Sequence, residues 1–153
     1  MLKASNNRFA VFLLSFVIAS FLQLNWKAAL GWSPEFVMAL FIICGFYLNL
    51  FEMLALSAAG IFIFNWRPEP GWEVLFFFSI PFMVIYARRF LPWHGGINNT
   101  VGIIFAVSAF YAISDFPAVA ANISLFSIIL GITAVFGAAV FQFFSYFYKI
   151  SPI

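Results

Sequence analysis

The carboxylate, imidazole and thiol side chains in this sequence, which could do acid–base chemistry, thiol chemistry or metal binding, are few and scattered. They are five carboxylates, one histidine and one cysteine: Glu35, Glu52, Glu69, Glu73, Asp115, His94 and Cys44. One histidine and one cysteine are too few for a His/Cys metal site. The sequence also contains no P-loop, no Rossmann glycine fingerprint, no G-x-S-x-G and no H-E-x-x-H. We therefore expect no catalytic residue, no cofactor and no metal, and a protein that is not an enzyme.

Six residues remain as candidate contacts for a partner or a ligand: Trp32, Glu35, Glu52, Arg67, Arg88 and Arg89. Glu52 lies between two strongly apolar runs. It fits a carboxylate at the start of a helix, or an ion pair with a partner's cation, or a proton carrier. Arg88 and Arg89 fit anchors to anionic lipid headgroups, or a docking point for a cytoplasmic partner that His94 and a glycine turn would assist. The Arg67 side chain is either paired with Glu69 or solvated.

The elements that position these residues follow from composition. Hydrophobic residues make up 65% of the 153 positions and charged residues only 8%, with a mean hydropathy of +1.08. A soluble domain is about 45–50% apolar and about 25% charged, because it needs a polar surface. So few charges could not cover this chain in water, and lipid must cover it instead. The basic residues form no patch that would indicate nucleic-acid binding.

Polar breaks divide the chain into six apolar runs. They are roughly Phe9–Trp26, Pro34–Leu50, Glu52–Trp66, Trp72–Ala87, Asn99–Ser114 and Ala118–Tyr148. The break at Asn49–Glu52 is open to two interpretations, a turn or one continuous helix. Several runs are only about 15–17 residues long, which predicts re-entrant helices or helices shielded by their neighbours.

The positive-inside rule distinguishes six crossings from five. With six crossings and a cytoplasmic N-terminus, five basic residues lie inside (Lys3, Arg8, Arg88, Arg89 and Lys149) and two lie outside (Lys27 and Arg67). With five crossings, three lie inside and four outside. We therefore predict an all-α membrane helix bundle of about six crossings, formed by residues 1–153 as one domain, with both ends in the cytoplasm. The indole rings of Trp26, Trp32, Trp66 and Trp72 then form an aromatic belt on the outer side.

Four stretches of the chain form a set: the first helix ending Leu22-Gln23-Leu24-Asn25-Trp26, the sequence Trp32-Ser33-Pro34-Glu35-Phe36 before the second, the stretch Gly60–Asn65, and a fourth helix ending in Arg88-Arg89. Together they resemble the rod shape-determining protein MreD family of bacteria. The family typically carries an aspartate at the end of its third helix, where this chain has Asn65. That difference places any acid-dependent role there in doubt.

The resemblance implies a non-catalytic scaffold of the cell-elongation machinery that synthesises peptidoglycan. Such a protein would lie in the cytoplasmic (inner) membrane and hold MreC-like and RodA-like proteins there by helix–helix contact. The family's fold is also similar to the substrate-binding subunits of energy-coupling-factor vitamin transporters. The alternative is therefore a small-molecule-binding subunit of an uptake transporter, with an outward cavity lined by residues such as Trp32, Glu35 and Arg67.

Overall fold

A computed structural model describes residues 2–64, 75–76, 79–80, 82–84, 86–87, 95–114 and 116–148. All regular structure in these ranges is α-helical, which confirms the predicted all-α class. The helices are α1 (Leu2–Leu30), α2 (Phe36–Tyr47), α3 (Leu50–Phe64), α5 (Gly95–Ser114), α6 (Phe116–Ala121) and α7 (Ile123–Phe147).

Three of these helices contain segments long and apolar enough to cross a membrane: Arg8–Leu30 in α1, Gly95–Ser114 in α5 and Ile123–Phe147 in α7. They identify the chain as a membrane protein with transmembrane helices. The 12 residues of α2 are about 18 Å long at 1.5 Å per residue, well short of the ~30 Å hydrocarbon core of a bilayer. A helix this short needs other parts of the protein around it.

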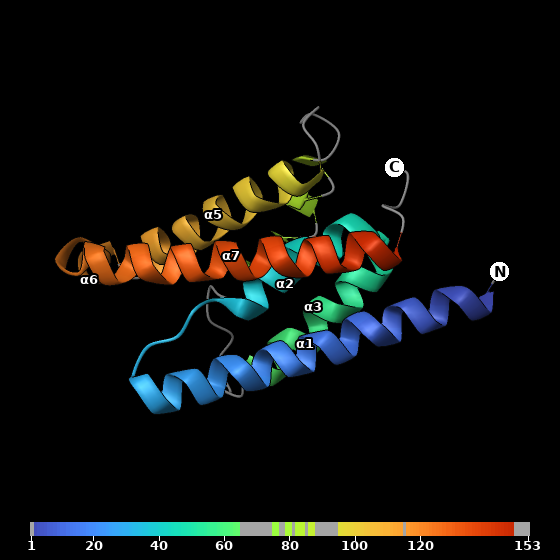
Figure 1. Cartoon of the computed structure of the whole chain (residues 1–153), viewed down its shortest axis with the longest axis horizontal. Helices are drawn as coiled ribbons and strands as arrows, with labels where there is room; N and C mark the ends of the chain where they lie inside the picture. Colours follow the sequence, from blue (N-terminus) through green and yellow to red (C-terminus); the bar gives the residue numbers. More distant parts are fainter. Residues whose placement is uncertain are drawn as a thin grey trace.

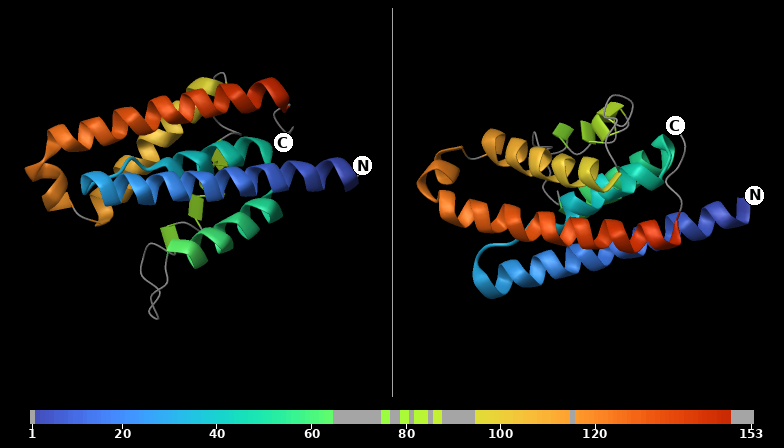
Figure 2. Two further views of the ribbon diagram at one scale, coloured as in Figure 1. Left: turned by 60° about the horizontal axis from the view of Figure 1, so that its bottom comes forward. Right: turned by 45° about the horizontal axis from the view of Figure 1, so that its top comes forward.

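Helix α2 lies at the centre of the bundle (Figures 1 and 2). It packs against α1, α3, α5 and α7, and all of its residues are buried. The prediction that a short run is shielded by neighbouring helices is confirmed for α2. Helices α1, α3 and α5 run in one direction and α2 and α7 in the other, and the start of α1 and the end of α7 lie at the same end of the bundle (Figure 1).

Aromatic side chains fill the core on both sides of α2. The Phe12 ring of α1 stacks on Tyr47, with ring centroids 5.6 Å apart, and approaches Phe144 of α7 at 4.5 Å. One turn further along α1, the Phe16 ring meets Phe41 edge-on at 5.3 Å. Large apolar side chains that point away from this core remain exposed along the three candidate spans, among them Leu14, Phe21, Phe105 and Val135. These are the surfaces that lipid would cover.

Two asparagines mark helix boundaries that the apolar pattern left unclear. A turn separates α2 from α3, because Leu48 is extended (φ −95°, ψ 155°) and α3 begins at Leu50. Of the two interpretations of the break at Asn49–Glu52, the turn is therefore correct and the continuous helix is wrong. The single run expected over Ala118–Tyr148 is wrong at Asn122, where the backbone (φ −131°, ψ 51°) separates α6 from α7. Asparagine favours such breaks because its side chain competes with the helical hydrogen bonds.

Candidate functional site

Four polar side chains from different parts of the chain meet beside the start of α2. The Tyr111 hydroxyl of α5 donates to Oε1 of Glu35 at 2.9 Å, and Nε2 of Gln23 in α1 donates to Oε2 at 2.9 Å. The Glu35 backbone N–H donates to the Thr133 hydroxyl of α7 at 3.0 Å. We call Gln23, Glu35, Tyr111 and Thr133 the Glu35 junction. It links α1, α5 and α7 to the central helix.

The connection between α1 and α2 brings Glu35 to this place. Gly31 ends α1 in the left-handed conformation (φ +77°), which glycine adopts without a steric penalty, and its N–H donates to the Lys27 carbonyl at 2.9 Å. Residues 32–35 are then non-helical. They carry the chain back along the bundle before α2 begins, and Ser33 and Pro34 are buried along the way.

Neighbouring helices also satisfy the first N–H groups of α2. The first turn of any helix has N–H groups without intrahelical acceptors, and the Glu35 side chain makes no cap hydrogen bond to its own helix. Instead, the Thr133 hydroxyl accepts from the Glu35 N–H, and Oε1 of Gln23 accepts from the Val37 N–H at 3.0 Å. Both ends of the Gln23 amide are therefore used. This arrangement fixes the start of α2 against α1 and α7.

The hydrogen bonds of the Glu35 junction favour a structural role for its carboxyl group. Each carboxyl oxygen accepts a hydrogen bond from a side chain of α1 or α5. The arrangement can hold three helices in register around α2.

A second polar group lies at the opposite end of α2, at the turn into α3. Oε2 of Glu52 accepts from the Asn49 N–H at 3.0 Å, and Oδ1 of Asn49 accepts from the Glu52 N–H at 2.9 Å. This reciprocal pair is a capping box at the start of α3. The Arg8 guanidinium of α1 also contacts Oε2 of Glu52 at 3.4 Å. Glu52 is thus a helix-start carboxylate with a cation from its own chain.

Replacing Asn49 by alanine is expected to lower the free energy of unfolding by about 1 kcal/mol, because alanine cannot accept the Glu52 N–H. Arg8→Gln should lower the free energy of unfolding by less than Asn49→Ala does, since partly exposed ion pairs contribute about 0–1 kcal/mol. Reversible unfolding in mixed micelles measures both. An Arg8→Gln variant less stable than Asn49→Ala would contradict this ranking.

The structure separates the residues singled out in the sequence. Glu35 precedes α2 and Glu52 follows it, so they belong to different polar groups at opposite ends of that helix. The Trp32 ring packs edge-on against Trp26 at 6.1 Å. Arg67, Arg88 and Arg89 lie outside the described residues, as do Trp66, Trp72 and His94.

Sequence reasoning missed three members of the Glu35 junction as site residues, Gln23, Tyr111 and Thr133. Each is a polar side chain inside a long apolar helix, which is the signal that could have identified them. Such residues face the bundle interior because lipid cannot satisfy their hydrogen bonds. Which helices would supply their partners was not readable from one sequence.

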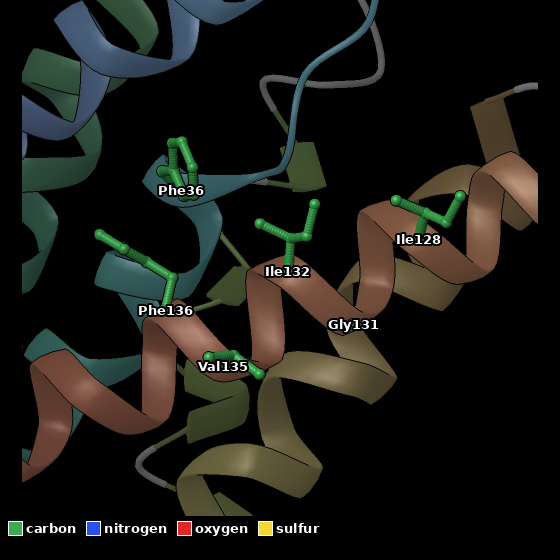
Figure 3. A pocket seen from close by; sticks show the side chains of 6 residues that line it. All are labelled: Phe36, Ile128, Gly131, Ile132, Val135 and Phe136. Carbon is green, nitrogen blue, oxygen red and sulfur yellow. The ribbon is translucent and has the colours of Figure 1, made fainter.

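An apolar groove lies on the outer surface next to the Glu35 junction (Figure 3). Its volume is about 550 Å³, and it is open rather than enclosed. The residues that line it are Phe36, Ile128, Gly131, Ile132, Val135 and Phe136. All but Phe36 come from one stripe of α7, at positions i, i+3, i+4, i+7 and i+8.

Comparisons of this chain with models of protein families, with curated proteins and with solved structures find no match. Within the part of the chain that the structure describes, no group of three or more histidine, cysteine or acidic side chains lies close enough together to hold a metal ion.

Proposed function

We propose that this protein is a non-catalytic scaffold subunit of the bacterial cell-elongation machinery, held in the cytoplasmic membrane. The observation that supports this proposal most is how the Glu35 junction uses its polar groups. Both oxygens of Glu35 and both ends of the Gln23 amide bond to other parts of the bundle. These groups hold helices together, whereas a catalytic or ligand-binding group needs an atom directed at a substrate.

The topology proposed for the scaffold has six crossings and cytoplasmic ends. This topology places five basic residues on the cytoplasmic side and two on the outer side, as the positive-inside rule favours. The positions of the start of α1 and the end of α7, at one end of the bundle (Figure 1), agree with an even number of crossings. Fusing a reporter enzyme to the N-terminus in one fusion protein and to the C-terminus in another tests the topology. Both fusions should report the cytoplasm.

The proposed partners are membrane proteins like MreC and RodA, which would dock on the outer faces of the bundle. Lipid-facing helices associate through close packing rather than through the hydrophobic effect, so a partner needs a complementary helix surface. The exposed apolar side chains of α1 and α5 offer candidate faces. Such a protein changes no bond in any substrate, and its output is the assembly itself.

Co-purification from a mild detergent tests the function directly. We expect the tagged chain, expressed at its native level in a rod-shaped bacterium, to recover membrane proteins of peptidoglycan synthesis. An untagged strain and an unrelated tagged membrane protein of similar size are the controls. Recovery of an ATPase pair instead would identify a transporter subunit and overturn the scaffold proposal, and recovery of no specific partner would also count against it.

A further inference from the structure

The groove on α7 has a length that suits a single lipid acyl chain. Its five α7 residues lie between Ile128 and Phe136, which are eight residue steps or about 12 Å apart along the helix axis. One leaflet of the hydrocarbon core is about 15 Å thick, half of the ~30 Å total. Because α7 is a candidate membrane span, a groove of this length along it is no longer than one leaflet is thick. A single acyl chain occupies that kind of space.

Gly131 opens the middle of the groove. A Cβ atom added at this position would meet nothing within 4 Å, and the Ile128 and Ile132 side chains lie on either side of it (Figure 3). The wall formed by Phe36 is rigid, because its ring packs against Phe136 at 4.6 Å and against Trp26 at 5.8 Å. The groove is therefore formed by side chains that the packing of the helices holds in place.

Groups suited to a phospholipid headgroup lie at the same end of the bundle as the start of α7. Trp26 and Lys27 are in the last turns of α1, and that end of α1 lies on the same side as the start of α7 (Figure 1). Lys27 is exposed, so its ammonium can reach a phosphate. The Trp26 indole N–H is buried without a hydrogen-bond partner and sits on the ring that contacts the groove wall. Lysine and tryptophan side chains favour the headgroup layer.

We propose that this surface is a binding site for one anionic phospholipid. An acyl chain lies in the α7 groove over Gly131, and the phosphate group meets Lys27 at the end of α1. Charge complementarity selects a lipid over a second protein helix here, because the exposed Lys27 follows Trp26, whose ring packs on the Phe36 wall, while the groove itself is lined by apolar residues. The site adjoins the Glu35 junction through Phe36, but it does not depend on the scaffold function, since it involves no partner protein.

Native mass spectrometry of the full chain, released from vesicles of phosphatidylglycerol and phosphatidylcholine in equal amounts, tests the site. The wild-type chain should retain one phosphatidylglycerol molecule in preference to phosphatidylcholine. Lys27→Gln should lower that preference about fivefold, which is the contribution of one lysine near anionic lipid, while leaving total lipid retention similar. Gly131→Leu fills the groove and should reduce retention of both lipids.

Ala58→Leu is the matched control, because it adds a similar side chain to an exposed position on α3 and should not change lipid retention. Circular dichroism of each variant checks that the helices are intact. Equal retention of the two lipids by the wild-type chain would overturn the proposal. So would a Gly131→Leu variant that retains lipid as the wild type does, or a dimer that Gly131→Leu dissociates, which would make a second copy the occupant.

Discussion

Replacing Glu35 by alanine is expected to lower the free energy of unfolding by about 2–4 kcal/mol. The change removes the acceptor of two donors, the Tyr111 hydroxyl and Nε2 of Gln23. Each buried polar group left without a partner costs about 1–3 kcal/mol. Polar contacts between membrane helices average nearer ~0.6 kcal/mol, so the loss should lie at the lower end of the combined range. Reversible unfolding with a denaturing detergent in mixed micelles measures the difference.

Glu35→Gln is the control that separates hydrogen bonding from charge. Its amide oxygen can accept from Gln23 and its amide N–H can donate to the Tyr111 hydroxyl, so we expect a cost below about 1 kcal/mol. Tyr111→Phe removes one of the two side-chain donors and should fall between the two Glu35 variants. Glu35→Ala within about 0.5 kcal/mol of the wild type would show that the Glu35 junction does not hold the bundle. Equal losses in both Glu35 variants would assign its role to charge.

Gly137→Leu is expected to be the most damaging single change in α7, at about 3 kcal/mol or more. A Cβ atom on Gly137 would overlap the Ile103 side chain of α5, and it would touch the Ala39 Cβ of α2 at 3.6 Å. Overpacking of a full core typically costs about 1–3 kcal/mol. A leucine adds three further carbons to that Cβ, at a place where α7 packs against both α5 and α2. The same unfolding measurement applies.

Gly131→Leu is an internal control for the Gly137 variant, because it makes the same substitution in the same helix. A Cβ atom at this position meets nothing within 4 Å, and the change replaces a poor helix former, so the stability of the variant should equal that of the wild type or exceed it by up to about 1 kcal/mol. Two smaller substitutions, Gly137→Ala and Ile103→Val, give an independent check of this contact between α7 and α5. Ile103→Val deletes the Cδ1 atom that Gly137→Ala would strike, so the double variant should be more stable than the sum of the single losses. Strict additivity would contradict the packing described here.

The class of the protein was readable from composition alone, and the interior of the bundle was not. Too few charges to face water predict a helical membrane protein, and breaks at Gly31 and Asn49 divide the first three helices near their observed ends. The pattern could not show that Asn122 interrupts the last run, because a single asparagine is also tolerated inside a helix.

The Glu35 junction illustrates what a single sequence leaves out. Glu35 was a candidate contact because it is a carboxylate in an apolar setting, but its partners are 12, 76 and 98 residues away in the chain. Hydropathy identifies which residues are polar within a span. The pairing between helices depends on packing angles and rotations that the apolar pattern does not specify.

The most direct test of the central claim, that α2 is the buried axis of a membrane-embedded bundle, uses the single cysteine of the chain. Cys44 lies in α2 with its side chain 0% exposed. A lipophilic maleimide should leave it unmodified in native micelles and add one label after unfolding, as intact mass reports. Leu14→Cys in a Cys44→Ala background places the thiol on the exposed face of α1 and should be labelled without unfolding. Labelling of native Cys44 as fast as that control would contradict the account.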